Sequence, residues 1–360
     1  MRINHVLPGR SEVVVIGGGV MGAAALHYLV ELGCERPVLV ERETLASGST
    51  GRCAGGVRTL FSDDLNRRIC DESIRRLERF EDEIGQELDL RLWGYLFLLE
   101  TDADAARFAA DGARMLTPGG ARELVPQLDV DGLAAAAFDE RAGYVTPDLV
   151  VQGYARHAAE RGALVEQSCA AIRVVTDRGR VTGVETTRGT IATERVILTA
   201  GVWSNELFDL PVEREPRHMF FTEDTPSFPR ELPLTIDFAT GFYFHREGAA
   251  LAFGGREKTL EDLAPIAARR LPSLEDVGIR STWWGFYEMS PDHNALIGAA
   301  ADPEGLFYAT GFSGHGFQQG PVVGEHLAQL ALGLEPTFDL SQFAVERFAS
   351  GAVRREQNVI

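Results

Sequence analysis

The sequence predicts an α/β protein in which a discontinuous nucleotide-binding domain carries a second, mainly antiparallel α+β cap. Three distant stretches each run from a short β-rich strand into a glycine turn: residues 13–22, 196–201 and 306–316. Such strand–turn units are typical of Rossmann-like domains. Residues 212–290 instead contain short aromatic strand-like pieces, which favour an antiparallel sheet. The predicted boundaries are 1–85, 146–210 and 291–360 for the nucleotide-binding domain, and 86–145 and 211–290 for a substrate-binding cap.

The first glycine turn has the spacing of a dinucleotide-binding motif. Val13–Ile16 runs directly into Gly17-x-Gly19-x-x-Gly22, and a helical apolar pattern follows. In this motif the first glycine makes the turn, the second lets the backbone approach a pyrophosphate, and the third lets the helix pack on the sheet. The N–H groups and positive dipole end of the helix then face the phosphates. The helix begins at this site with Val20 and Met21.

An acidic residue ends the second predicted strand. Pro37–Val40 leads into Glu41, about 20 residues after the last glycine of the motif. A carboxylate at this place accepts hydrogen bonds from a ribose 2′-hydroxyl and repels a 2′-phosphate, so NADP is disfavoured. Arg42 follows directly and is expected at the same site. These residues alone do not distinguish NAD from FAD.

Composition disfavours several kinds of partner. The net charge is −18, which disfavours nucleic acid and anionic membrane surfaces because both attract basic patches. The four cysteines are scattered and lack the spacing of a metal site or a disulfide framework. No run approaches the about 20 apolar residues of a membrane span. We therefore expect no metal, no nucleic-acid or membrane partner, and a reduced, cytoplasmic setting.

Local patterns predict the remaining elements. Helices are expected where apolar residues recur at helical spacing or where a Thr-Pro pair begins a helix, namely over 63–84, 102–115, from 118, 149–161 and 317–332. Strands are expected where short aromatic or β-branched runs lie between turns, namely over 93–99, 134–144, 163–198, 219–222, 240–245, 251–254, 282–289 and 306–310.

Five short motifs, in order along nearly the whole chain, resemble those of the D-amino-acid-oxidase-like FAD-dependent oxidoreductases. Within that family they are most similar to the sarcosine oxidase, dimethylglycine dehydrogenase and glycine oxidase branch. The motifs are Gly17–Gly22 with Glu41, Ser47–Gly56, Thr199–Ser204, Trp284–Asp292 and Gly311–Phe317. The resemblance implies bound FAD, and it therefore favours FAD over NAD.

The same motifs provide groups that suit a flavin dinucleotide. Glycine-rich backbone lies close to a flat ring, hydroxyls suit a pyrophosphate, and N–H groups at a helix end stabilise the negative charge of reduced flavin. Trp203 is expected as a wall of the site, with a core position as its alternative. The resemblance implies further cofactor contacts from Ser49, Thr50, Arg52, Ala54, Gly55, Gly56, Ala170, Ala200, Gly201, Trp203, Gly285, Gly314, His315, Gly316, Phe317 and Gln318.

The sequence departs from the family at positions that matter for chemistry. Gly285 and Arg52 stand where a cysteine or a histidine of some relatives bonds to the flavin, so FAD is expected to be non-covalent. Ala252 is the best match to a cap lysine that activates oxygen in some relatives. Gln318 stands where other relatives have a lysine. A neutral side chain at this position is expected to weaken carboxylate binding. Oxidase and dehydrogenase activity therefore both stay open.

The candidates for handling the substrate are Tyr287, Tyr243, Arg58, His315 and Gln318. The two tyrosines lie in motifs that line the substrate cavity in relatives, with core positions as the alternative. Arg58 follows the glycine-rich loop and is a candidate for binding a carboxylate or the flavin edge, with a surface ion pair as its alternative. Arg246 is a weaker carboxylate candidate. His315 lies between two glycines at the expected flavin site, which favours function over structure.

The resemblance implies oxidation of a C–N bond in a small amine or an N-substituted or cyclic amino acid. A hydride passes from the carbon beside the nitrogen to flavin N5, and the resulting imine hydrolyses. Two alternatives stay open: a 2-hydroxy-acid dehydrogenase with the same fold, and a flavin-carrying subunit or assembly factor of a hetero-oligomer. Oxygen or another carrier is the expected electron acceptor, and both homo- and hetero-oligomers are compatible with the sequence.

Overall fold

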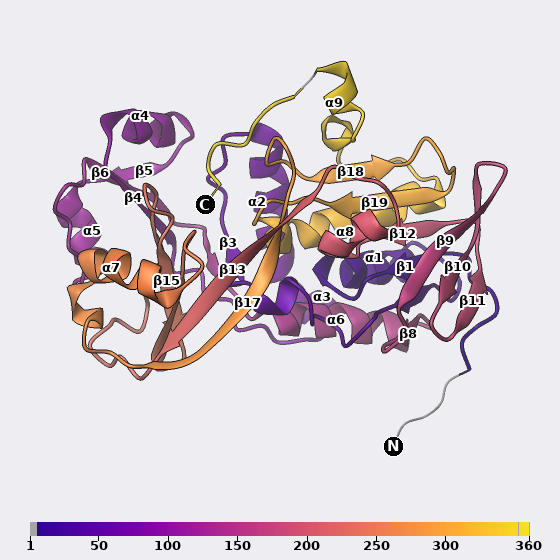
Figure 1. Cartoon of the computed structure of the whole chain (residues 1–360), viewed down its shortest axis with the longest axis horizontal. Helices are drawn as coiled ribbons and strands as arrows, with labels where there is room; N and C mark the ends of the chain where they lie inside the picture. Colours follow the sequence, from indigo (N-terminus) through magenta and orange to yellow (C-terminus); the bar gives the residue numbers. More distant parts are fainter. Residues whose placement is uncertain (1–5, 352, 360) are drawn as a thin grey trace.

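The computed structural model describes residues 6–351 and 353–359. Its two large sheets lie toward opposite ends of the molecule (Figure 1). The six-stranded sheet has the order β18-β19-β12-β1-β2-β8, and the eight-stranded sheet has the order β17-β13-β16-β15-β14-β4-β6-β5. The long antiparallel strands β13 (Glu213–Thr222) and β17 (Ile279–Met289) cross the middle of the view as a diagonal pair.

The six-stranded sheet is mainly parallel and is assembled from three distant parts of the chain. Its strands are β1 (Val14–Ile16), β2 (Val38–Val40), β8 (Leu164–Glu166), β12 (Val196–Leu198), β18 (Leu296–Ala299) and β19 (Leu306–Thr310). The neighbours of β1 run parallel to it, whereas β18 runs antiparallel to β19. All residues of β1, β2 and β12 are buried apolar residues, as expected for parallel strands covered on both faces.

Helices and a small sheet surround this parallel sheet. The helices are α1 (Val20–Glu31), α2 (Asp64–Glu78), α3 (Phe80–Ile84), α6 (Pro147–Glu160) and α8 (Gly316–Leu332). Helix α1 packs against both α6 and α8, and α2 packs against α8. Asp63 begins α2 as its N-cap, because its carboxylate accepts hydrogen bonds from the N–H groups of Leu65 and Asn66. The small sheet contains β9 (Ala171–Asp177), β10 (Arg180–Thr186) and β11 (Gly189–Ala192).

The cap is an eight-stranded sheet with three helices. Besides β13 and β17, its strands are β4 (Tyr95–Leu99), β5 (Arg114–Leu116), β6 (Ala135–Asp139), β14 (Leu234–Asp237), β15 (Tyr243–Glu247) and β16 (Ala250–Gly254). The pairing is antiparallel except between β14 and β4. The cap helices are α4 (Asp102–Ala110), α5 (Pro118–Leu124) and α7 (Leu260–Arg270).

Short elements complete the described chain. They are the two-stranded pair β3 (Gly56–Val57) and β7 (Gly143–Tyr144), the helix α9 (Arg347–Ser350), and the 3₁₀ helices η1 (Thr50–Arg52), η2 (Gly201–Glu206), η3 (Pro272–Leu274) and η4 (Ser341–Phe343). The strands of the two large sheets alternate along the chain, but the exact domain boundaries stay a prediction. No helix of residues 6–351 and 353–359 is long and apolar enough to cross a membrane.

The predicted elements need correction in the cap and at α2. The helix expected over 63–84 is interrupted at Arg79, which separates α2 from α3. The helix expected over 102–115 ends at Ala110, because Arg114–Leu116 pairs with β6 instead. Helix α7 is not expected from the apolar pattern, since Pro265 lies inside it. Strands β14 and β18 are also not expected, because their short apolar runs gain strand structure only through their neighbours.

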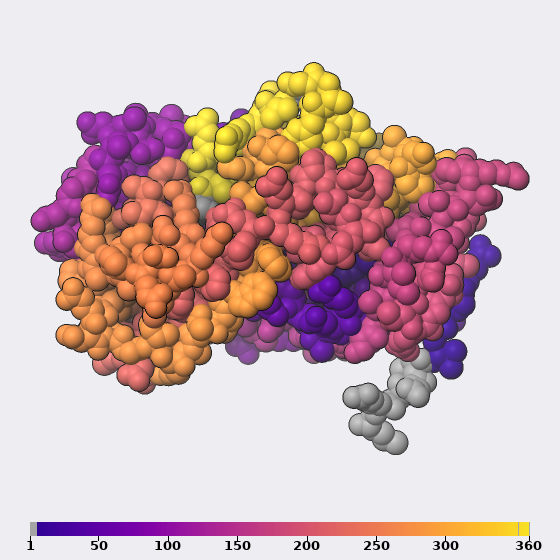
Figure 2. Space-filling model, viewed as in Figure 1, coloured from indigo at the N-terminus to yellow at the C-terminus, as the bar shows by residue number. Residues whose placement is uncertain are grey.

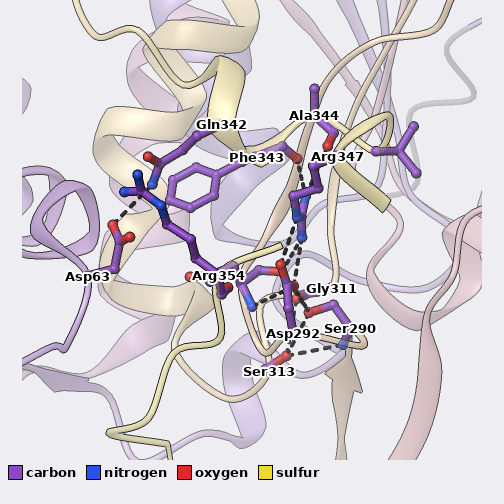
Figure 3. Close-up of polar contacts among 12 residues, drawn as sticks. Asp63, Ser290, Asp292, Gly311, Ser313, Gln342, Phe343, Ala344, Arg347 and Arg354 are labelled. Carbon is purple, nitrogen blue, oxygen red and sulfur yellow. Dashed lines mark hydrogen bonds and ion pairs between the residues drawn. The ribbon is translucent and has the colours of Figure 1, made fainter. Parts of the chain in front are cut away.

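A buried ion pair anchors the turn before β18 (Figure 3). Arg347 binds both carboxylate oxygens of Asp292 at 2.8 Å, and both residues are almost fully buried. Beside them, the backbone N–H of Ser290 donates to the hydroxyl of Ser313 at 3.1 Å. The Ser-Pro-Asp motif therefore connects the turn before β18 to the glycine turn before α8.

Two buried histidines connect α1 to α6. The Nδ1 atoms of His27 and His157 lie 2.9 Å apart, and the nearest oxygen of Glu31 lies 3.9 Å from the His157 Nδ1. Burial lowers the pKa of His27 to about 3, so its imidazole is neutral at pH 7. These three side chains could also hold a metal ion. The expectation of no metal therefore stays a prediction.

The stability of the cap depends on a buried arginine at the end of α7. Arg270 donates to Asp237 at 2.8 Å and to Glu100 at 2.9 Å, and Arg270 and Asp237 are nearly inaccessible. We expect Arg270→Ala to lower the free energy of unfolding by about 3–5 kcal/mol, because it leaves a buried carboxylate unpaired.

Arg269→Ala is the matched control for this prediction. Arg269 pairs with the same Glu100 but is largely exposed, so the expected loss is below about 1 kcal/mol. Urea unfolding of the holoprotein measures both, and equal losses would contradict the assignment.

Candidate functional site

A cavity of about 440 Å³ lies between the six-stranded sheet and the cap. This volume falls in the range of about 300–1,000 Å³ that is typical of cofactor and small-molecule sites. The glycine turn before α1, the end of β2, the loop at η1, the start of η2, strand β17 and the N-terminus of α8 all contribute walls. In the space-filling view, the indigo N-terminal segment is visible between the orange cap strands and the pink strands beside it (Figure 2).

The turn before α1 leaves no room for side chains. Gly17 has a φ of +107°, and a Cβ atom there would lie 2.5 Å from the carbonyl oxygen of Thr199. A Cβ atom on Gly22 would lie 1.9 Å from the carbonyl oxygen of Gly17. Gly22 does not line the cavity, so its role is to let α1 pack against the turn. The bare N-terminus of α1 is thereby directed at the cavity, where an anionic pyrophosphate is favoured.

Glu41 is held rigidly at the end of β2. One carboxylate oxygen accepts a hydrogen bond from the N–H of Gly18 at 2.7 Å, and the other accepts one from the N–H of Glu43 at 2.7 Å. Each oxygen keeps a further lone pair for a ligand hydroxyl. This arrangement fits a ribose, whose 2′-hydroxyl donates to a carboxylate at this position.

The structure brings the predicted cofactor residues together. All of them except Gly22 line the one cavity, including the distant Ala170 and Phe317. The two hydroxyls of the serine-rich loop also have internal partners: Ser49 donates to the carbonyl oxygen of Phe286 at 2.7 Å, and Thr50 accepts from the N–H of Val20 at 3.2 Å. The loop is therefore fixed to both β17 and α1. The contacts of these residues with FAD stay a prediction.

The two positions of possible covalent attachment are neighbours in space. A Cβ atom on Gly285 would lie 3.1 Å from the Cβ of Arg52, and Arg52 donates to the carbonyl oxygen of Trp284 at 3.2 Å. Neither side chain is a nucleophile. Cys53 also lines the cavity, but burial raises the pKa of its thiol to about 12, so it remains protonated.

Three tyrosines and an arginine form the cap side of the cavity. Tyr243 and Tyr287 line it as predicted, and Tyr95 and Arg217 are additional lining residues that the sequence motifs do not reveal. Burial raises the pKa of each of the three tyrosines, so their hydroxyls stay protonated. The guanidinium of Arg217 lies 4.8 Å from the centre of the Tyr287 ring. Arg217 and Met219 lie on the same face of β13. The strand is expected over 219–222 only, so the sequence analysis does not include Arg217 in it.

Arg58 lines the cavity but is bound by the protein itself. Its guanidinium donates to the carbonyl oxygens of Leu60 and Asn358, the latter at 2.6 Å, and lies 3.9 Å from the ring centre of Phe61. No carboxylate of the described residues is within ion-pair distance, and burial lowers the pKa of Arg58. The alternative of a surface ion pair is therefore wrong, since Arg58 is only 5% exposed.

His315 is a buried side chain that lacks a protein partner. Both ring nitrogens are inaccessible and have no hydrogen bond within the part of the chain that the structure describes. Burial lowers the pKa of His315 to about 4, so the imidazole is neutral at pH 7. Next to it, Gln318 accepts a hydrogen bond from the N–H of Arg58 at 2.7 Å. His315 therefore lines the cavity as a neutral ring whose orphaned nitrogens leave hydrogen-bonding capacity unused.

Glu288 is another lining residue that the sequence analysis does not predict. It accepts a hydrogen bond from the hydroxyl of Thr310 at 2.7 Å, and burial raises its pKa to about 7.

Two other candidates from the sequence analysis, Arg246 and Ala252, lie outside the cavity. Arg246 does not line the cavity and donates to the carbonyl oxygens of Thr225 and Ala249. Ala252 is buried inside the cap and does not line the cavity.

Comparisons with known proteins agree with this geometry. A family model described as FAD dependent oxidoreductase matches residues 12–330. Human mitochondrial sarcosine dehydrogenase is 30% identical over 95% of this chain and 42% of that protein. Sarcosine oxidase subunit beta of Rhizobium meliloti (strain 1021) is 26% identical over 94% of this chain and 89% of that protein. The chain thus spans well under half of the length of the sarcosine dehydrogenase.

Solved structures with the same fold cover almost the entire chain. L-proline dehydrogenase from P.horikoshii has a TM-score of 0.89 at 28% identity, with 97% of this chain and 100% of that chain covered. Glycine oxidase from Geobacillus kaustophilus has a TM-score of 0.83 at 24% identity, with 94% of this chain and 99% of that chain covered. The second similarity concerns the fold alone.

A glycine turn facing a helix end, with a fixed carboxylate beside it, defines a dinucleotide-dependent enzyme. The family model covers most of the chain, so the chain belongs to the FAD-dependent oxidoreductase family and FAD is its cofactor. The residues present fit that cofactor. The turn excludes side chains at Gly17, Glu41 is positioned for a ribose, and His315 has unsatisfied ring nitrogens. When bound, FAD supplies hydride-accepting chemistry that these side chains lack.

We expect FAD to be released intact by acid. Gly285 and Arg52 offer no bond to the flavin, and Cys53 is held as a thiol. The purified protein should therefore be yellow, and precipitation with trichloroacetic acid should leave the yellow colour in the supernatant. A flavin that stays with the precipitated polypeptide would contradict non-covalent binding. A colourless protein that cannot bind added FAD would contradict the fit of the site.

We expect Glu41→Ala to weaken FAD binding without unfolding the protein. The loss of charge-assisted hydrogen bonds to a ribose should cost about 1.5–3 kcal/mol of binding free energy. Fluorescence titration of the apoprotein with FAD measures the change, and circular dichroism checks the fold. Glu35→Ala, at an exposed position outside the cavity, is the control and should bind FAD as the wild type does. An unchanged affinity for Glu41→Ala would remove this carboxylate from the site.

Proposed function

We propose that the protein oxidises the C–N bond of a small amine or amino acid, with transfer of a hydride to flavin N5. The observation that supports this most is the composition of the cap side of the cavity. Tyrosines, an arginine and apolar side chains there adjoin the walls that fit FAD. Such a pocket suits a small substrate with one polar end. The names of the relatives, sarcosine dehydrogenase and L-proline dehydrogenase, agree with a substrate of this class.

Glu288 lines the cavity with a raised pKa but is bound to the hydroxyl of Thr310, and the proposed reaction needs no strong base. Tyr243 and Tyr287 remain protonated and can only donate or accept hydrogen bonds, because burial raises their pKa values. A substrate amine must lose its proton before it can release a hydride. Buried cations at the cavity, Arg58 and Arg217, disfavour an ammonium group and so lower the pKa of a bound amine. The protein then needs only to orient the neutral amine and exclude water.

A second candidate is a catalytic subunit that works inside a hetero-oligomer. The similarity to a protein named sarcosine oxidase subunit beta, over 89% of that protein, favours this possibility. It is compatible with the same oxidation chemistry. The two candidates differ in whether the isolated chain turns over its substrate, so activity of the chain purified alone distinguishes them.

The test of the proposed function is anaerobic reduction of the bound flavin by a panel of small compounds. We expect loss of the flavin absorbance at about 450 nm with N-methylglycine, L-proline or a similar amine, and no loss with 2-hydroxy acids. Tyr287→Phe should reduce more slowly at unchanged FAD content, because the hydroxyl that orients the substrate is removed. Reduction by hydroxy acids alone would contradict the proposal. Peroxide formation in air then separates an oxidase from a dehydrogenase.

A further inference from the structure

Of the arginines that line the cavity, Arg58 and Arg217 are the mostly buried ones, and their surroundings differ. The guanidinium of Arg58 donates hydrogen bonds to the carbonyl oxygens of Leu60 and Asn358 and packs on Phe61. Its charge is therefore solvated by the protein. A ligand that took Arg58 as its partner would have to displace these backbone contacts first.

Arg217 lines the cavity and keeps guanidinium donors that have no partner among the described residues. Its one ion pair among the described residues joins Nη1 to Glu215 at 2.5 Å, and the Glu215 side chain is itself 39% exposed. Within residues 6–351 and 353–359, no protein acceptor lies within hydrogen-bond distance of its Nε or Nη2. The residue opposite Arg217 on β17 is Gly285, so no side chain of that position competes with Arg217. The guanidinium side chain is only 11% exposed, so water satisfies it poorly.

The position of Arg217 matches the recognition of a carboxylate. A guanidinium presents a planar pair of donors that a carboxylate accepts in a bidentate manner, and the pair is strongest where water is excluded. The guanidinium carbon of Arg217 lies over the Tyr287 ring, 4.8 Å from its centre, where a cation–π contact supports its position. Met219 follows two residues later on the same face of β13, and Leu234 and Ile236 line the cavity as well. The polar anchor therefore adjoins an apolar wall.

We propose that Arg217, and not Arg58, binds the carboxylate of the substrate. This inference rests on the proposed oxidation of a C–N bond and narrows its substrate to an amino acid with an apolar N-substituent or ring. The apolar side chains of Met219, Leu234 and Ile236 then contact the carbon skeleton. A bare amine of the same shape lacks the anchoring group and binds weakly.

The first test measures binding without turnover. Pyrrole-2-carboxylate is a planar carboxylate that has no hydride to give, and its binding is followed by the perturbation of the flavin spectrum of the holoprotein. We expect Arg217→Gln to weaken this binding by about 30-fold or more, and Arg217→Lys to weaken it less. Arg280→Gln is the matched control, since Arg280 lies on the adjacent strand β17, is exposed and pairs with Asp224 outside the cavity. FAD content verifies the fold of each variant.

The second test uses pairs of compounds that differ by a carboxylate. The wild type should reduce its flavin faster with L-proline than with pyrrolidine, and Arg217→Gln should lose most of that preference through a higher apparent Kd. If no amine of the panel reduces the wild-type flavin, the proposed function fails while the pyrrole-2-carboxylate titration still reports on Arg217. Wild-type affinity of Arg217→Gln for pyrrole-2-carboxylate would overturn the inference. So would a failure of the wild type to bind it, or a larger loss in Arg58→Gln at full FAD content.

Discussion

The rest of the site depends on one close backbone contact, between the glycine turn after β1 and the end of β12. Gly17, at the end of β1, lies so close to Thr199, at the end of β12, that a methyl group would overlap the carbonyl oxygen. The parallel pairing of β1 with β12 fixes this approach. It aligns the N-terminus of α1, the end of β2 and the start of η2 around one opening. Glu41 and Gly201 have their positions in the cavity for that reason.

The charge state of each ionisable group in the cavity depends on its burial and on its hydrogen-bond partners. Arg58 donates to carbonyl oxygens of the protein and needs no ligand, whereas Arg217 pairs with the half-exposed carboxylate of Glu215. His315 is neutral because burial without a partner disfavours its charged form. Burial raises the pKa of Glu288 to about 7, although hydrogen bonds from Thr310 and from backbone N–H groups oppose that shift. The protein as a whole carries a charge of −18, yet the cap side of the cavity is dominated by cations and neutral donors.

The segment from Arg354 to Val359 completes the site from the opposite end of the chain. Glu356 is almost fully buried and accepts hydrogen bonds from Ser62, from the N–H of Asp63 and from the side chain of Asn66. Although burial opposes it, these bonds and one from Asn358 lower the pKa of Glu356, which stays ionised. Asn358 then supplies the carbonyl oxygen that holds Arg58. The segment thus links the start of α2 to the cavity wall.

The sequence by itself determined the parts of the protein that depend on local geometry. Glycine spacing, a strand before it and an acid after it specify the cradle, because backbone approach and a ribose carboxylate need particular residue types at particular distances along the chain. All but one of the predicted cofactor residues accordingly line one cavity. Only the tertiary structure decided the substrate side. Tyr95, Arg217 and Glu288 enter the cavity through strand register and long-range pairing, and whether Arg58 is free depends on Asn358, 300 residues away. No local pattern encodes such partners.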